Sequence, residues 1–372
     1  MKYFGQQASM EYLSYMKERE GGNKEMETLA FGVNQRGEKA SLYTLENKKH
    51  TVIKVSDHGA TLVSVLIPDK NGVVRDVVLG YDEASEYDSH TCYFGATIGR
   101  NGNRIDKAQM MIDGKLCKIP ANENENNLHS GPNGFDRVVW EVKERTDNSI
   151  TFFHLSTEEE QGFPGNLKVE VTYTLTDEDA VEISYRGEAD KTTVMNFTNH
   201  SYFNLGGHDS GSAMNQKLQI LAESYNPVRD SKSIPTGEIA PVAGTPMDFR
   251  TMKPIGQDIE ADFEQLKFTG GYDHNYVLSD KAGEMKVMAN AYCEETGIAM
   301  EASTDCCGVQ LYAGNFIGDQ TGKDGKAYCK RCGFCLESQY YPNAMNQENV
   351  PSPIVKAGDV FTTKTVYRFY VK

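Results

Sequence analysis

The strongest constraint on the fold is a series of short segments in which apolar and polar residues alternate. In LKVEVTYTL (167–175) five apolar side chains fall on one face, which is the pattern of a strand with one side buried. The turn residues Asp177, Glu178 and Asp179 follow, and AVEISY (180–185) then alternates in the same way. Strands with one polar face joined by a short turn are typical of antiparallel sheets. The pair therefore predicts a hairpin.

Similar segments occur along the chain from about residue 28 onward. HTVIKV (50–55) and TLVSVLI (61–67) precede the turn sequence DKNG, and VFTTKTVYRFYV (360–371) is a further strand candidate. Helical patterns alternating with strands are missing, which argues against a parallel α/β fold. The sequence therefore predicts an all-β protein, either a large antiparallel sandwich or a barrel.

The domain organisation follows from the absence of repeats, low-complexity tracts and linkers rich in Pro, Gly and Ser. We expect residues 28–372 to form one β-sandwich domain. Before it, Met10, Leu13 and Met16 share one helical face and a Gly-Gly pair then ends the pattern. We therefore expect residues 1–27 to be an extension, helical in part, that packs on the larger body.

The charge of the chain excludes several kinds of partner. The net charge is −15 and the isoelectric point is near 5.1, which argues against nucleic acid or an anionic membrane surface as a partner. A membrane-spanning run needs about 18 apolar residues or more, and the sequence has none. An apolar stretch with a small-residue cleavage site is also missing from the first residues. We expect a cytoplasmic protein.

Eight cysteines allow two interpretations. Cys329, Cys332 and Cys335, with Cys306 and Cys307 upstream, resemble half of a zinc site. A structural zinc site normally uses two well-spaced pairs, and adjacent cysteines are a poor second pair. Without an export signal, disulfides are not expected either. We expect free, reduced cysteines and no metal, with a zinc or redox role as the alternative.

Three histidines stand out because each lies in a dense run of polar and aromatic residues. His200 lies in NFTNHSYFNLGG (196–207), His129 in NENNLHSGPNGFDRVVW (124–140) and His274 in GYDHNYVL (271–278). Amide side chains next to core phenylalanines are tolerated only when they are paired. The His200 segment therefore predicts the polar wall of a pocket, with a purely structural polar cluster as the alternative.

Two carboxylates lie among apolar neighbours. Asp248 is part of TPMDFR (245–250), and Glu337 follows Leu336 in GFCLESQYYPN (333–343). Burial raises the pKa of a carboxyl group and suits it for proton transfer. A lone glutamate in a strand usually occupies an edge position that faces water. The local sequence around Glu337, taken alone, favours this interpretation.

The sequence contains none of the common cofactor or metal motifs. HExxH, GxSxG and the Walker loop are missing, and the glycines of GATIGRNGNRI (95–105) lack the spacing of a dinucleotide loop. Planar polar side chains combined with aromatic rings suit neutral polyols. The residues therefore suggest a carbohydrate ligand, with one histidine and one glutamate available for chemistry.

Six segments resemble those of the galactose mutarotase family, also called the aldose 1-epimerase family. They follow one another in the family order, and the resemblance covers about nine tenths of the chain. They are NNLHSGPNGFDRVVW, NFTNHSYFNLGG, TPMDFR, GYDHNYVL, GVQLYAGNFI (308–317) and the segment that begins GFCLESQYYPN. The resemblance implies an antiparallel β-supersandwich with an open sugar cleft and no cofactor. It also implies interconversion of the α and β anomers of D-galactose or D-glucose, by a monomer or weak homodimer.

The motifs also imply roles for individual residues. His200 is then the general acid that protonates the ring oxygen, and Glu337 is the general base that takes the proton of the C1 hydroxyl. The other matched positions are expected to contact the sugar: Asn103, Arg104, His129, Ser201, Tyr202, Asp248 and Gln310.

The chain departs from the family pattern at Gly102, Ser130, Met247 and Asn343. Met247 and Asn343 lie beside inferred pocket residues, so we expect them to affect sugar preference. One alternative function is a hexose-6-phosphate 1-epimerase, which would need further cations near the cleft, where only Arg100 and Arg104 are found. Another is a sugar-binding module without catalysis.

Overall fold

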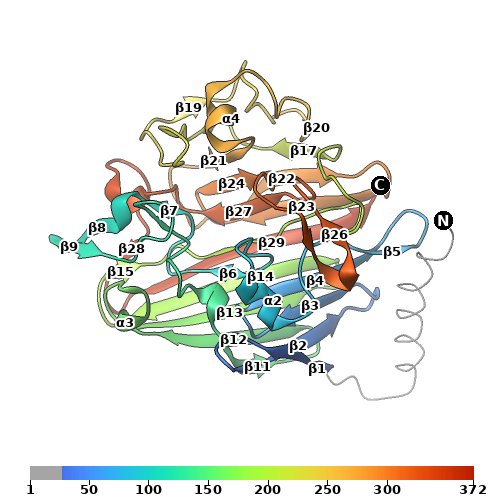
Figure 1. The fold of residues 1–372 in the computed structure, drawn as a ribbon, viewed down its shortest axis with the longest axis horizontal. Coiled ribbons are helices and arrows are strands. Elements are labelled where there is room, and N and C mark those ends of the chain that lie inside the picture. Colours follow the sequence, from blue (N-terminus) through green and yellow to red (C-terminus); the bar gives the residue numbers. More distant parts are fainter. Residues whose placement is uncertain (1–26) are drawn as a thin grey trace.

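The computed structural model describes residues 27–372, and strands make up most of the regular structure there (Figure 1). The all-β prediction is confirmed. The expected extension lies outside these residues, apart from Glu27. The helices of the described part are short: α2 (Ala84–Ser89), α3 (Glu158–Gln161) and α4 (Glu264–Thr269), with 3-10 turns at Asp106–Ala108, Phe135–Arg137, Lys323–Gly325 and Ala344–Asn346.

The largest sheet has nine antiparallel strands in the order β11-β12-β13-β14-β29-β23-β22-β17-β20. The hairpin predicted from the alternating pattern forms its β13–β14 pair, with Tyr173 opposite Ile183. The strands are β11 (Glu141–Arg145), β12 (Ser149–Ser156), β13 (Leu167–Leu175), β14 (Ala180–Ala189), β17 (Lys217–Ile220), β20 (Lys253–Pro254), β22 (Lys286–Tyr292), β23 (Ile298–Thr304) and β29 (Val360–Val371).

Two five-stranded sheets accompany the large one. The first is a meander in chain order: β1 (Thr28–Val33), β2 (Lys39–Glu46), β3 (Val52–Ser56), β4 (Thr61–Pro68) and β5 (Val74–Asp76). The second has the order β19-β18-β21-β24-β27 and consists of β18 (Ser224–Tyr225), β19 (Ala240–Pro241), β21 (Asp273–Val277), β24 (Gly308–Tyr312) and β27 (Cys335–Gln339).

Short strand pairs complete the described structure. They are β6 (Thr97–Ile98) with β16 (Thr198–Asn199), β7 (Arg104–Ile105) with β10 (Asn127–Leu128), β8 (Gln109–Ile112) with β9 (Lys115–Lys118), β15 (Thr193–Val194) with β28 (Ile354–Val355), and β25 (Gln320–Thr321) with β26 (Ala327–Tyr328).

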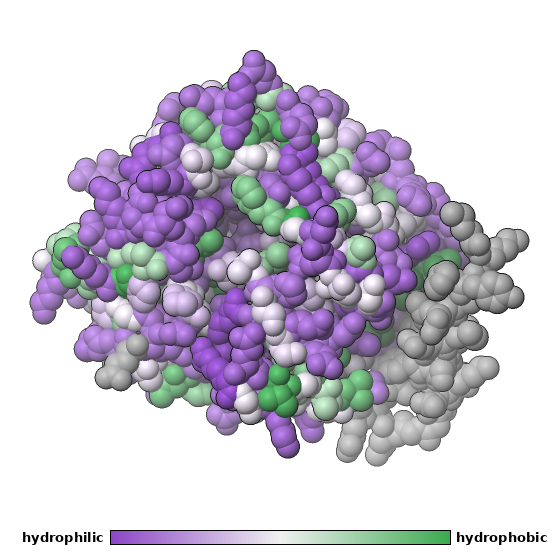
Figure 2. All heavy atoms as spheres, viewed as in Figure 1, coloured by the Kyte–Doolittle hydropathy of each residue, from purple (hydrophilic) through white to green (hydrophobic). Residues whose placement is uncertain are grey.

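One continuous hydrophobic core receives side chains from all three main sheets, including Val55, Val171 and Leu336. Full burial of such a side chain stabilises the fold by about 1.5–3 kcal/mol. The surface seen in Figure 2 is mostly hydrophilic, with apolar residues in small groups. Among residues 27–372, none of the helices combines the length and apolar character needed to cross a membrane. The division into an extension and one domain remains a prediction.

Candidate active site

Strands β21, β24 and β27 each turn a polar side chain to the same face of their sheet. The register places Asn275 opposite Gln310, and Gln310 opposite Glu337. Residues paired directly across antiparallel strands share a face. The other face of these strands, which carries Leu311 and Leu336, belongs to the hydrophobic core. The sheet is therefore apolar toward the core and polar toward the site.

Glu337 and His200 meet on this polar face. His200 follows β16, and its Nε2 lies 3.6 Å from Oε2 of Glu337. The two residues are only 4% and 2% exposed. Oε2 of Glu337 has no hydrogen-bond partner within the described part of the chain. A buried carboxylate oxygen without a partner is costly for folding, so this arrangement favours a role in ligand binding or chemistry.

Burial shifts the two pKa values in opposite directions. It lowers the pKa of His200 to about 4. It raises the pKa of Glu337 well above its ordinary value; the negative charge of Asp273 adds to this shift and Arg104 opposes it. Two titratable groups whose environments move their pKa values in this way are typical of acid–base sites.

Asp273 and Arg104 form the charged side of the site. Gln310 Nε2 donates a hydrogen bond to Asp273 Oδ1 at 2.7 Å, and Arg104 Nη1 lies 3.7 Å from Asp273 Oδ2. Arg104 also pairs with Glu123 through two hydrogen bonds, of 2.6 and 2.8 Å. Sequence reasoning missed Asp273, although it singled out the adjacent His274. The motif GYDHNYVL contained the signal, a carboxylate at the start of a polar strand.

His129 completes the cluster. Its ring lies edge-on to that of His200, with centroids 5.2 Å apart, and its Nδ1 accepts a hydrogen bond from the Asn103 backbone N–H at 3.1 Å. Burial lowers the pKa of His129 well below its ordinary value, helped by the neighbouring His200 and Arg104. Neutral His129 therefore carries its hydrogen on Nε2, because Nδ1 is already an acceptor. The side chain offers a ligand hydroxyl one N–H donor.

The backbone around Asn103 and His129 is unusual. Both residues have positive φ, 65° and 52°, in the left-handed region that non-glycine residues seldom adopt. Such conformations are concentrated at functional sites, where the surrounding structure maintains them. The Asn103 side chain is used locally, since its Oδ1 accepts the Arg104 N–H at 2.8 Å.

Two tyrosine rings stack on the His200 ring. The centroid distance is 5.1 Å for Tyr202 and 5.7 Å for Tyr93, and Tyr93 also meets His129 edge-on at 4.9 Å. Aromatic rings provide the flat apolar surfaces that the C–H faces of a sugar pack against. Tyr202 was predicted from the sequence, whereas Tyr93 was missed, although it stands two residues before the glycine-containing segment 95–105.

His129, His200 and Glu337 also offer three potential metal-ligand atoms within 4.8 Å of one another. A histidine coordinates a metal through a nitrogen that has no hydrogen. Because Asn103 donates to Nδ1 of His129, the hydrogen of that ring sits on Nε2, and the present arrangement supplies an N–H donor there. The hydrogen-bond pattern fits a sugar hydroxyl better than a metal ion.

The cysteines do not assemble into a zinc site in the described residues. All eight are free, and the one group of possible metal ligands found in residues 27–372 contains no cysteine. Cys306 lies against Thr363 and Cys307 against the Gln339 carbonyl. The thiols of Cys306 and Cys307 thus form hydrogen bonds with residues other than Cys329, Cys332 and Cys335.

The structure does not bring Asp248 to the cluster. Its carboxylate is held by Arg250, with Nε and Nη2 at 3.0 and 2.8 Å. The carbonyl of the preceding Met247 accepts a hydrogen bond from Tyr276, which belongs to the core face of β21. Asp248 therefore lies on the core side of this sheet, whereas Glu337 lies on its polar side. Met247 is fully buried in the core, so this departure from the family pattern does not face the site either.

Ser201 also points away from the cluster. Its hydroxyl donates to Asn199 Oδ1 at 2.5 Å, and the Asn199 amide in turn bonds the Gly95 carbonyl and Tyr173. The hydroxyl that was expected to contact the sugar is thus engaged with Asn199. Of the residues predicted from the sequence, the structure groups His200, Glu337, His129, Arg104, Gln310 and Tyr202, with Asn103 alongside.

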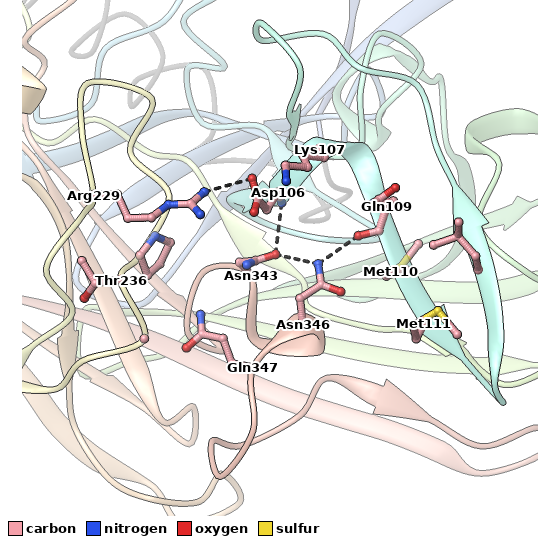
Figure 3. Close-up of a pocket in the computed structure, with 13 residues that line it drawn as sticks. Asp106, Lys107, Gln109, Met110, Met111, Arg229, Thr236, Asn343, Asn346 and Gln347 are labelled. Atoms are coloured by element: carbon pink, nitrogen blue, oxygen red, sulfur yellow. Dashed lines mark hydrogen bonds and ion pairs between the residues drawn. The ribbon is translucent and has the colours of Figure 1, made fainter.

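A pocket of about 350 Å³ is lined by Asp106 and Lys107, which follow β7, and by Asn343 and Arg229 (Figure 3). The Asn343 N–H donates to the Arg104 carbonyl at 2.9 Å, and Arg229 pairs with Asp106 at 3.0 Å across the pocket. Neither His200 nor Glu337 lines it. Asn343 thus connects this pocket to the site through the backbone, and it remains a candidate for influencing sugar preference.

Comparisons with known proteins agree on one family. The family model described as "Aldose 1-epimerase" matches residues 41–368. The galactose mutarotase of Sus scrofa is 40% identical over 320 residues, which cover 86% of this chain and 91% of the relative. The aldose 1-epimerase of Escherichia coli K12 is 37% identical over 335 residues, covering 90% and 96%.

Solved structures show the same fold. A GalM/aldose epimerase homologue from C. elegans has a TM-score of 0.80 and 30% identity, covering 89% of this chain and 99% of its own. A galactose 1-epimerase from Lactobacillus acidophilus also has a TM-score of 0.80, with 26% identity over 93% and 99% of the two chains.

Proposed function

The chain belongs to the aldose 1-epimerase family, and we propose that it interconverts the α and β anomers of D-galactose and D-glucose, with His200 and Glu337 as the acid–base pair. The observation that carries these roles is the 3.6 Å approach of His200 Nε2 to Glu337 Oε2 in a buried cluster. Mutarotation needs one proton donor and one proton acceptor, and this pair can supply both.

The reaction opens and recloses the sugar ring. Glu337 takes the proton of the C1 hydroxyl while His200 protonates the ring oxygen, and the C1–O5 bond breaks to give the open-chain aldehyde. Rotation about C1–C2 presents the other carbonyl face, and reclosure with reversed proton roles gives the other anomer. Each positioned proton transfer contributes about 10²–10⁴-fold to the rate.

Sugar binding relies on the remaining members of the cluster. Arg104, His129 and Gln310 offer N–H donors to hydroxyl groups, and Asp273 offers a carboxylate acceptor. We propose Asp273 as the carboxylate contact in place of Asp248, because Asp273 bonds Gln310 on the face that carries Glu337. Tyr93 and Tyr202 provide apolar ring surfaces beside the reacting histidine.

The pH profile of kcat/KM tests the acid–base pair. The working enzyme holds one proton between His200 and Glu337. Burial favours that proton on Glu337, and the ring-opening step described above starts from the form in which it has moved to Nε2 of His200. Below pH about 4 both groups are protonated and no base remains; above the raised pKa of Glu337 both are deprotonated and no acid remains. We expect a bell with its acid limb near pH 4 and its alkaline limb well above the usual glutamate range. A rate that rises continuously with pH through the whole range would contradict the pair.

Asp273→Asn tests the electrostatic part of the site. The negative charge of Asp273 helps to raise the pKa of Glu337, so its removal should lower that pKa. The alkaline limb of the kcat/KM profile is then expected to move to lower pH, and KM should rise because a sugar contact is weakened. Asp248→Asn, which changes a carboxylate outside the cluster, is the matched control and should leave both quantities unchanged.

The structure gives no support to a hexose-6-phosphate substrate. Neither of the arginines that the sequence offered presents an unpaired positive charge to a phosphate. Arg100 is fully buried and bonds Ser156 and the Pro164 carbonyl, and Arg104 pairs with Glu123. Polarimetry of freshly dissolved α-D-galactose, α-D-glucose and other aldoses tests the proposed substrates, and saturation by glucose 6-phosphate in preference to galactose would reverse the choice.

We also propose a cytoplasmic monomer or weak homodimer that binds neither nucleic acid nor membranes. The free cysteines and the net charge of −15 support this. Size-exclusion chromatography with light scattering over a range of concentrations tests the oligomeric state.

A further inference from the structure

The second ring nitrogen of His200 has a sulfur neighbour. Nδ1 lies 3.6 Å from Sγ of Cys335, which is two residues before Glu337 and on the same face of β27. The cysteine is fully buried and the histidine nearly so. In acid–base sites this nitrogen usually bonds a carbonyl or carboxylate oxygen. Here a thiol occupies that place.

The two nitrogens of His200 have different tasks if, as proposed above, this histidine exchanges a proton with the sugar. The exchange takes place at Nε2, because Nε2 is the nitrogen that faces Glu337. Nδ1 therefore keeps its hydrogen in both the charged and the neutral form of the ring, and it needs an acceptor throughout. Within residues 27–372, the side-chain partner found at Nδ1 is Cys335, and the histidine's own backbone also bonds the ring and opposes the lowering of its pKa by burial.

We propose that Cys335 is a positioning residue for His200: its sulfur accepts the Nδ1–H hydrogen bond and so keeps Nε2 turned to the sugar, in the tautomer that can take up and release a proton. The inference rests on the proposed function and adds a residue to it. Cys335 does not contact the reacting atoms in this proposal; it acts through the histidine ring.

Sulfur suits this position because it is a weak hydrogen-bond acceptor. It orients the ring but stabilises the imidazolium little, so His200 remains a strong acid toward the ring oxygen. A thiolate would instead form an ion pair with the imidazolium and retain the proton. Burial, with the negative charges of Glu337 and Asp273, raises the pKa of Cys335 well above its ordinary value, which keeps the group a neutral thiol.

Other titratable groups surround the same ring. Glu337 faces Nε2, His129 lies edge-on, and the rings of Tyr93, Tyr202 and Tyr312 pack around it. A change at Cys335 could therefore alter activity through packing alone. The experiment must read the position of the His200 hydrogen itself.

Nitrogen-15 NMR of the full-length protein gives that direct reading, with the His200 signals assigned by their loss in His200→Asn. At neutral pH we expect Nδ1 to carry the hydrogen and Nε2 to be bare. The opposite tautomer, with the hydrogen on Nε2 and the thiol donating to Nδ1, would overturn the proposal. This measurement uses the wild-type protein and so does not depend on a variant that folds.

Substitutions at Cys335 provide the functional test. Cys335→Ala removes the acceptor, so the His200 tautomers should mix and kcat should fall roughly 2–10-fold with little change in KM, as expected for one neutral hydrogen bond. Cys335→Ser restores an acceptor and should recover part of kcat. Oxygen accepts more strongly than sulfur, so the serine variant should also move the acid limb of the pH profile upward.

Cys332→Ala is the matched control, because Cys332 is a buried thiol in the same apolar cluster as Cys335. It should keep the wild-type tautomer and pH profile. A Cys335→Ala enzyme with both features unchanged would contradict the positioning role, while an inactive His200→Asn in the same series would leave the proposed acid–base pair standing. Full activity of His200→Asn would instead contradict the proposed function.

Discussion

Glu337→Gln is expected to lower kcat by about 10²–10⁴-fold, the usual contribution of a positioned proton transfer, while the sugar still binds. Glutamine has nearly the shape of glutamate but cannot take the C1 hydroxyl proton. The decay of optical rotation of fresh α-D-galactose measures the rate, and titration calorimetry measures binding. Glu301→Gln, which changes a strand glutamate paired with Arg368 outside the cluster, is the control and should be fully active.

The same variant should be at least as stable as the wild type at neutral pH. Glu337 is buried, its Oε2 lacks a partner, and its pKa is raised in the folded state. A raised folded-state pKa means that stability is lost as pH increases from the unfolded-state pKa to the folded-state value. Glutamine does not ionise, so the variant avoids this loss. Its melting temperature should equal or exceed that of the wild type at pH 7, with a smaller difference at pH 4.

Turnover by Glu337→Gln at the wild-type rate would remove Glu337 from the mechanism. A variant that is inactive but also fails to bind sugar would indicate a binding role instead of a base. The combination of lost turnover, retained binding and undiminished stability is specific to a residue kept for chemistry, because active sites commonly sacrifice stability for function.

His200→Asn is the second change expected to have a large effect. Asparagine retains a polar side chain but has no group that gains and loses a proton near neutral pH, so ring-oxygen protonation should fail and kcat should fall by about 10²–10⁴-fold. His208→Asn removes another buried histidine, which bonds Tyr328 outside the cluster, and should retain activity once the folded fraction is taken into account.

The double variant His200→Asn/Glu337→Gln provides a further check. Residues that act as a unit give strongly non-additive losses of activity. The double variant should therefore have about the same kcat as the less active of the two single variants. A loss equal to the product of the two single losses would mean that the residues act independently, contrary to the shared-proton mechanism. The same polarimetric measurement distinguishes these outcomes.

The fold class could be predicted from the sequence because strand burial is encoded locally. The segment 167–175 alternates with period two, and in the structure each of its apolar positions is buried. His200 could also be proposed as a site residue from its own segment, because amides packed beside phenylalanines require a paired polar environment. Glu337 was different: its local pattern suggested an edge glutamate, and the family resemblance alone assigned it a role.

The positions that the structure places differently from the expectation have a common physical origin. Asp248 stands among apolar residues and Asp273 at the start of a polar strand, and neither local pattern shows which face of a sheet the carboxylate approaches. The structure places Asp273 on the face of Glu337, through its bond to Gln310, and binds Asp248 to Arg250 elsewhere. Ser201 was assigned to the site as part of the motif around His200, yet successive residues of an extended chain point to opposite sides.

The sequence by itself determined the strands, their antiparallel connection and the residue types available for chemistry, because these depend on periodicity and turn residues close in the chain. The tertiary structure decided which of these residues meet. Glu337, His200 and His129 come from three distant segments, and only the tertiary fold buries their side chains within 4.8 Å of one another. That burial also moves the pKa values of His200 and Glu337 in opposite directions, since desolvation depends on everything that surrounds a group and not on its neighbours in sequence.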